Sequence, residues 1–86
     1  MKKPTVEIYT TATCVYCQQA KHLLARKGIE YTEIRIDLDP NKKNEMVERS
    51  GRKTVPEVFI DGELIGGFDD LWNYDQSGRL DARMRR

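Results

Sequence analysis

The chain has 86 residues, enough for one domain with a modest hydrophobic core. Fifteen Lys and Arg residues face fourteen Asp and Glu residues, and a net charge of +1 gives no reason to expect a nucleic-acid partner. No apolar run approaches the roughly 20 residues of a membrane span, and the basic start at Met1 soon turns polar. We therefore expect no signal peptide, no membrane association and a cytoplasmic protein.

The first half of the chain predicts two strands joined by a helix. Val6 and Ile8 form the apolar face of the first strand, with Glu7 and Tyr9 on the opposite face. Thr13 is the expected N-cap of the helix. The expected elements are a strand over residues 5–10, a helix over residues 15–27 and a strand over residues 31–36. This βαβ unit should place its two strands parallel, with a right-handed crossover.

The second half predicts a helix, a β-hairpin and a final helix. Asp61-Gly62 is a strong hairpin signal, and Asp69 and Asp70 are expected to cap the last helix. The expected elements are a helix over residues 41–50, strands over residues 55–60 and 63–65, and a final helix that runs through residues 71, 72 and 74. Gly78 should end that helix and leave residues 79–86 as a basic tail, which is either a solvated end or a segment that docks to an acidic partner. The result is a single α/β domain over residues 1–86, with a four-stranded mixed sheet and the order β-α-β-α-β-β-α.

Two cysteines, Cys14 and Cys17, are the only ones in the chain, and they form a Cys-x-x-Cys pair at the start of the first helix. Backbone N–H groups and the helix dipole at that position favour a negatively charged sulfur, and the thiolate is the form that attacks disulfides. Cys14 is therefore the expected nucleophile. Cys17, almost one turn further in on the apolar face, is either the resolving thiol or a small core residue. The pair predicts a redox-active thiol protein.

Three further motifs accompany the cysteine pair. Tyr16 lies between the cysteines, Thr54-Val55-Pro56 lies at the third strand, and Gly66-Gly67-Phe68-Asp69-Asp70 follows the fourth. In this element order, the set resembles the thioredoxin fold and, within it, the small bacterial dithiol glutaredoxins. Two positions depart from the usual family pattern, since Val15 replaces a proline and Thr11 replaces a lysine found in many members.

The resemblance implies a glutathione-disulfide oxidoreductase that reduces protein–glutathione mixed disulfides and protein disulfides. Glutathione would serve as the reductant, with no bound cofactor or metal, and the protein would act as a monomer. The implied glutathione-binding residues are Tyr16, Thr54, Val55, Pro56, Gly67, Phe68, Asp69 and Asp70. Pro56 would be cis and face Cys14, while Asp70 would meet the amino group of the γ-glutamyl residue. Arg52 and Lys53 are either partners of the glycyl carboxylate or solvated charges.

Two alternative functions stay open, and the resemblance itself implies the first, because some glutaredoxins without the proline that Val15 replaces carry an iron–sulfur cluster. Two copies of the chain, each with Cys14, together with two glutathione thiols would supply the four ligands of a [2Fe–2S] cluster. The other alternative is a thioredoxin-like electron donor that a flavoenzyme reduces instead of glutathione.

Overall fold

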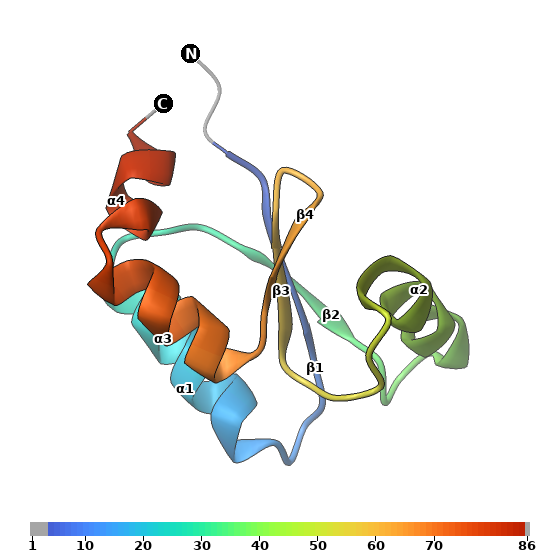
Figure 1. Ribbon diagram of the computed structural model, residues 1–86. Helices are drawn as coiled ribbons and strands as arrows, with labels where there is room; N and C mark the ends of the chain where they lie inside the picture. The colour runs from blue at the N-terminus through green and yellow to red at the C-terminus, as the bar shows by residue number, and fades with distance from the viewer. Residues whose placement is uncertain (1–3, 86) are drawn as a thin grey trace.

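The computed structural model describes residues 4–85. Residues 1–3 and residue 86, on which the expectations about a signal peptide and the end of the basic tail partly depend, lie outside this range. Eight elements follow one another along the chain (Figure 1), namely β1 (Val6–Thr10), α1 (Val15–Arg26), β2 (Thr32–Arg35), α2 (Pro40–Ser50), β3 (Glu57–Ile60), β4 (Glu63–Gly66), α3 (Phe68–Gln76) and α4 (Arg79–Met84). None of the helices within residues 4–85 is long and apolar enough to cross a lipid bilayer.

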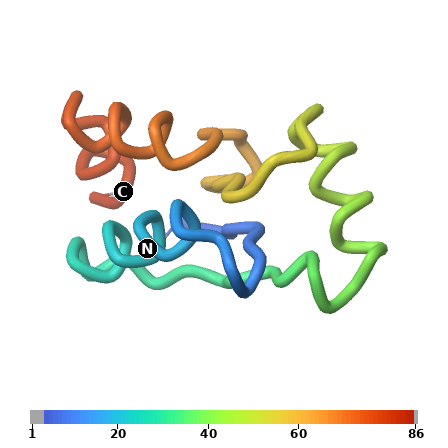
Figure 2. The backbone as a smooth tube through the Cα atoms, turned by 90° about the horizontal axis from the view of Figure 1, so that it is seen from below, coloured from blue at the N-terminus to red at the C-terminus, as the bar shows by residue number. Residues whose placement is uncertain are grey.

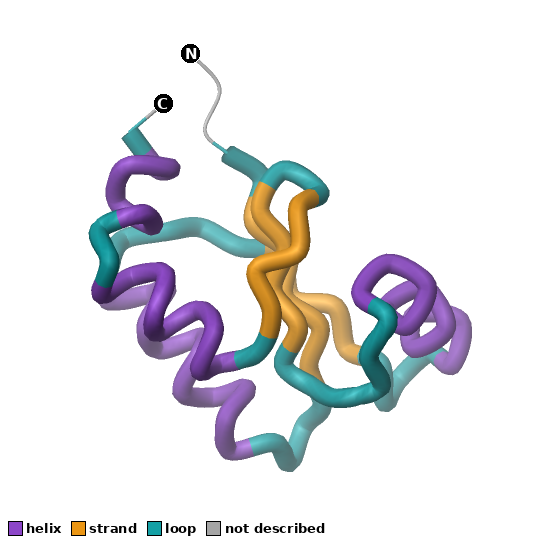
Figure 3. Tube along the Cα trace, viewed as in Figure 1, coloured by secondary structure: helices purple, strands orange, loops and turns teal. Residues whose placement is uncertain are grey.

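The predicted mixed four-stranded sheet is confirmed, with the strand order β2-β1-β3-β4. β1 pairs parallel with β2 and antiparallel with β3, and β3 pairs antiparallel with β4. Helices α1 and α3 cover one face of the sheet and α2 covers the other (Figure 3). Seen from below, α1 and α3 lie side by side and run in the same direction (Figure 2), so their N-termini lie near each other.

Two hydrophobic clusters fill the space on either side of the sheet. The larger cluster lies beneath α1, α3 and α4 and consists of Val6, Ile8, Ala20, Leu23, Leu24, Val58, Ile60, Leu71 and Leu80. The smaller cluster lies beneath α2 and consists of Tyr9, Ile36, Met46 and Phe59. The apolar face predicted for the first helix, with Cys17 among its members, is buried as expected.

Tyr9 lies on the face of the first strand opposite to Val6 and Ile8, as predicted, but the sequence did not reveal that this face is also buried. The side chain is fully buried because α2 packs over that face of the sheet. Its hydroxyl donates a hydrogen bond to Glu45 and accepts one from Arg49 at 2.7 Å. Burial, together with the bond to Glu45, raises the pKa of Tyr9 to about 12. The face of the sheet beneath α2 therefore has its own apolar cluster, bordered by the polar contacts of Tyr9 with Glu45 and Arg49.

The third strand begins at Glu57, two residues later than predicted. Pro56 has no N–H group to donate to the sheet, so the segment before Glu57 stays outside the strand ladder. The strand's four residues are all buried. Because β3 lies between β1 and β4, the preceding loop lies at the end of a central strand, near the start of α1.

The basic tail predicted after Gly78 is instead the helix α4, and the expectation of a solvated end is wrong. Leu80 is fully buried in the larger cluster and anchors the helix. Arg83 donates hydrogen bonds to the carbonyl oxygen of Ile60 at 3.0 Å and to the hydroxyl of Tyr74 at 3.2 Å, and pairs with Glu63 at 2.9 Å. Contacts with α3 and the β3–β4 hairpin therefore keep α4 packed on the domain, although its basic composition predicted a solvent-exposed tail.

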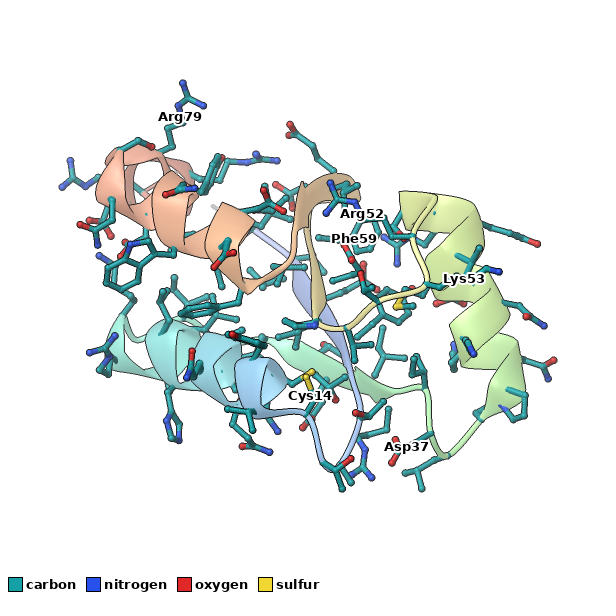
Figure 4. The ribbon with its side chains drawn as sticks, turned by 60° about the horizontal axis from the view of Figure 1, so that its bottom comes forward. Cys14, Asp37, Arg52, Lys53, Phe59 and Arg79 are labelled. Carbon is teal, nitrogen blue, oxygen red and sulfur yellow. The ribbon has the colours of Figure 1, made fainter. Side chains whose placement is uncertain are left out.

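Replacing Leu80 with alanine should lower the free energy of unfolding by roughly 3 kcal/mol, because the change removes a buried leucine side chain and leaves a cavity. Arg79→Ala is the matched control, since Arg79 lies on the same helix and points into solvent (Figure 4). That change should alter stability by less than about 0.5 kcal/mol. Urea denaturation of both variants checks the prediction, and equal effects would show that α4 does not dock through Leu80.

Candidate active site

The thiol of Cys14 lies at the N-terminus of α1 and is itself the N-cap of this helix. Its Sγ accepts a hydrogen bond from the backbone N–H of Cys17 at 3.1 Å. Thr13 was predicted for this position, and the sulfur takes the role one residue later. Cys14 is only partly buried, so an incoming disulfide can reach it. The N–H donor and the positive end of the helix dipole both stabilise negative charge on this sulfur.

Cys17 has a different environment although it is one turn away. Its side chain is fully buried on the sheet-facing side of α1. Burial is the main cause, and the hydrogen bond with Cys14 the second, of a pKa of the Cys17 thiol that is raised to about 12. Cys17 therefore stays protonated at neutral pH. Of the two cysteines, Cys14 has the surroundings of a nucleophile, and Cys17 has those of a thiol that reacts only with a sulfur brought next to it.

The loop before β3 lies opposite Cys14. The Val55–Pro56 peptide bond is cis, and the carbonyl oxygen of Val55 lies 3.8 Å from the Sγ of Cys14. Figure 4 shows the Cys14 side chain at the end of α1 nearest to this loop. Pro56 is buried and Val55 is partly buried, whereas Thr54 is exposed. The loop therefore presents backbone groups beside the sulfur, as an extended peptide ligand requires.

The start of α3 forms the other side of the site. Gly67 is the N-cap of α3, two and three residues before Asp69 and Asp70, which were predicted to cap it. Asp70 instead reaches back, and its Oδ2 accepts a hydrogen bond from the backbone N–H of Gly67 at 3.0 Å. The ring of Phe68 stacks on Tyr16 with the centroids 6.2 Å apart, which joins α3 to α1 next to the cysteines. A helix N-terminus placed here favours an anionic group of a ligand.

A cavity of about 280 Å³ lies between these two sides. All eight residues that the resemblance implied for glutathione line it, together with Arg52 and Glu57. Lys53 does not line the cavity, and Figure 4 shows it on the side of the loop that faces α2. The fold thus brings together residues from α1, the loop before β3 and the start of α3. Their roles toward a ligand stay predictions.

Glu57 is the lining residue that sequence reasoning missed. It is the first residue of β3, and its side chain is fully buried. Oε2 accepts a hydrogen bond from the hydroxyl of Thr54 at 3.1 Å, whereas Oε1 accepts none from any residue in the described range. Burial raises the pKa of the Glu57 carboxyl. The available signal in the sequence was a single charged residue within an apolar strand pattern. Charged residues are rarely fully buried unless they are paired with another polar group, so Glu57 indicates a polar contact at this end of the strand.

Glu57→Gln should stabilise the protein at neutral pH by about 1 kcal/mol, because glutamine keeps an oxygen for Thr54 and removes a poorly paired buried charge. The raised pKa means that the folded protein binds the proton more tightly than the unfolded chain. The contribution of Glu57 to the stability of the wild type therefore falls as pH rises from the ordinary glutamate range through the raised pKa. Denaturation from pH 4 to pH 8 should show the two proteins close together at pH 4 and diverging above it. A constant difference across this range would contradict the prediction.

A partly exposed thiol at a helix N-cap, beside a cis-proline loop on a mixed four-stranded sheet, defines a thiol protein of the thioredoxin-like fold. The family model for glutaredoxin matches residues 6–65. Glutaredoxin 3 of Escherichia coli is 51% identical over 80 residues, which cover 93% of this chain and 96% of that protein. The chain belongs to the glutaredoxin family, and the resemblance read from its motifs is confirmed.

Solved structures agree with this assignment. The solution structure of glutaredoxin from Brucella melitensis has a TM-score of 0.85 and 45% identity, covering 98% of this chain and 91% of that chain. The crystal structure of a buckwheat glutaredoxin–glutathione complex has a TM-score of 0.87 and 27% identity, covering 95% of this chain and 77% of that chain. Family membership supports thiol–disulfide oxidoreductase activity with glutathione.

Proposed function

We propose that the protein reduces protein–glutathione mixed disulfides and protein disulfides through the thiolate of Cys14, with glutathione as the reductant. One observation carries the proposal. The Sγ of Cys14 caps α1 and at the same time lies 3.8 Å from the carbonyl oxygen of Val55, a residue that lines the cavity. A thiol at a helix N-terminus and a backbone surface for a peptidic disulfide therefore occupy one place. The expectation of a monomer in the cytoplasm stays a prediction.

The reaction with a mixed disulfide proceeds in two exchanges. The Cys14 thiolate attacks the glutathionyl sulfur, the bond to the target protein breaks, and the target leaves as a thiolate. The thiolate of a second glutathione then attacks the glutathionyl sulfur on Cys14, which releases the Cys14 thiolate and glutathione disulfide. Neither exchange needs Cys17. The burial and raised pKa of Cys17 keep it from competing for the first attack.

The reaction with a protein disulfide uses both cysteines. Cys14 attacks one sulfur of the target and forms a mixed disulfide between the two proteins. The Cys14 attack releases the first target thiolate, which can take up the proton of Cys17. Cys17 then attacks the Cys14 sulfur, which frees the second target thiolate and leaves a Cys14–Cys17 disulfide. Two glutathione molecules then reduce this disulfide. The Cys17 backbone N–H already lies 3.1 Å from the Cys14 sulfur, so the two residues are adjacent before the reaction begins.

The cavity suggests how glutathione would be held. The backbone of Val55 pairs with the cysteinyl part, and the N-terminus of α3 receives the α-carboxylate of the γ-glutamyl residue. Asp70 is the acidic group for the neighbouring amino group. Tyr16, whose ring is 60% exposed, covers the ligand from the α1 side. Arg52 is a cation on the lining of the cavity, whereas Lys53 is not part of that lining.

The wild-type protein should reduce a small glutathione mixed disulfide when glutathione, glutathione reductase and NADPH are supplied. The measurement is NADPH oxidation, compared with the same assay in which thioredoxin reductase replaces glutathione and glutathione reductase. Turnover only in the first assay supports the proposal. Turnover only with thioredoxin reductase would overturn it in favour of a donor reduced by a flavoenzyme.

A further inference from the structure

Arg52 lies between two carboxylates on the wall of the cavity. Its Nη1 is 3.2 Å from Oδ2 of Asp70 and 3.8 Å from Oε1 of Glu57. The first distance is a hydrogen bond and the second is an ion-pair contact too long to be one. Figure 4 places Arg52 on the side of the loop that faces β4 and α3. One guanidinium group therefore connects the loop before β3 with the start of α3.

The two carboxylates differ in what they would gain from Arg52. Asp70 is about half exposed, with 48% of its side chain accessible, and the Gly67 N–H already donates to it. Glu57 is fully buried, and its Oε1 accepts no hydrogen bond within residues 4–85. A buried charged oxygen without a donor is costly, whereas a half-exposed ion pair contributes little. The guanidinium thus lies closer to Asp70, although Glu57 would gain more stabilisation from it.

We propose that Arg52 moves from Asp70 to Glu57 when the amino group of glutathione binds Asp70. The inference rests on the proposed function, which assigns that amino group to Asp70. A second cation at the Asp70 carboxylate repels Arg52, and Glu57 offers the displaced guanidinium a buried acceptor nearby. Arg52 occupies the place of the ligand's ammonium group in the free protein. Glu57 is then a positioning residue that lowers the free-energy cost of moving Arg52 away from the Asp70 carboxylate.

The exchange makes the site selective for a thiol peptide with a free amino group. A ligand without this group leaves Arg52 on Asp70 and does not engage Glu57. Removing the charge of Glu57 should therefore weaken the binding of glutathione and leave the binding of desamino-glutathione unchanged. The same substitution is expected to stabilise the fold, so a loss of affinity cannot be attributed to unfolding.

The test uses the Cys17→Ser protein, in which the reaction stops at the mixed disulfide. Cys14 reacts with glutathione disulfide to give Cys14–glutathione disulfide and one reduced glutathione, and mass spectrometry gives the equilibrium constant. Glu57→Gln should lower this constant about threefold to tenfold, a size typical of the coupling that one ion pair transmits. With the disulfide of desamino-glutathione, the two proteins should give the same constant.

Arg52→Gln provides the second arm of the experiment. In this background Glu57→Gln should have no further effect on the equilibrium constant with glutathione, because no guanidinium is left to move. Equal losses for glutathione and its desamino analogue, or a full Glu57→Gln effect without Arg52, would overturn the inference and leave the proposed function intact. Failure of the parent protein to form the mixed disulfide at all would instead count against the proposed function.

Discussion

Replacing Cys14 with serine should abolish glutathione-coupled turnover, lowering the rate by roughly a thousandfold or more, as expected when a catalytic nucleophile is removed. The sulfur that caps α1 is the group that attacks, and a serine hydroxyl does not form the corresponding anion at neutral pH. Serine is itself a good N-cap, so α1 should keep its start and the fold its stability. The measurement is NADPH oxidation with a small glutathione mixed disulfide, with circular dichroism as the check on folding.

Cys17→Ser is the matched control because it changes the other thiol of the same helix. It should keep most of the activity with the glutathione mixed disulfide, since neither exchange passes through Cys17. It should lose activity toward a protein disulfide, where Cys17 has to release the target. Full activity of Cys14→Ser, or equal losses in both variants with the small substrate, would contradict the assignment of Cys14 as the sole nucleophile. Cys17→Ala offers a second variant should a buried serine hydroxyl disturb the core.

Local patterns were enough to predict the strands, the first three helices and the mixed sheet. Alternation in β1, the glycine after α1 and the Asp61-Gly62 turn each act over a few residues, so they can be recognised without the rest of the fold. The candidate site followed for the same reason. Its motifs lie at the ends of elements, and the thioredoxin-like order brings those ends together at one side of the sheet.

The features that sequence reasoning missed all depend on contacts between distant segments. Tyr9 is buried because α2, more than thirty residues later, covers its face of the sheet. α4 is stabilised because Leu80 packs into the larger cluster and Arg83 donates hydrogen bonds to β3 and α3. The basic composition of this segment does not reveal these contacts. Glu57 becomes a buried neighbour of Arg52 only when the strand and the loop are both in place.

Gly66→Ala should destabilise the protein by roughly 3 kcal/mol and weaken the binding of glutathione at the same time. Gly66 has a φ of +122°, a conformation that costs an alanine about 1–3 kcal/mol. An added Cβ would also lie 2.2 Å from Oδ2 and 2.8 Å from Cβ of Asp70. The second contact involves an atom fixed by the backbone of α3, so rotating the carboxylate away does not relieve it. The start of α3 has to shift, and Asp70 then loses its hydrogen bond to Gly67.

Gly62→Ala separates the two effects of that substitution. Gly62 has a φ of +80° in the hairpin turn, and a Cβ there would meet no atom within 4 Å. This variant should therefore show only the backbone cost, about 1 kcal/mol, with an unchanged KM for the glutathione mixed disulfide. Gly66→Ala should lose more stability and raise that KM, because the shifted Asp70 carboxylate is the proposed partner of the ligand's amino group. If both variants gave the same stability and KM, the close approach of Asp70 to the backbone at Gly66 would have no part in shaping the site.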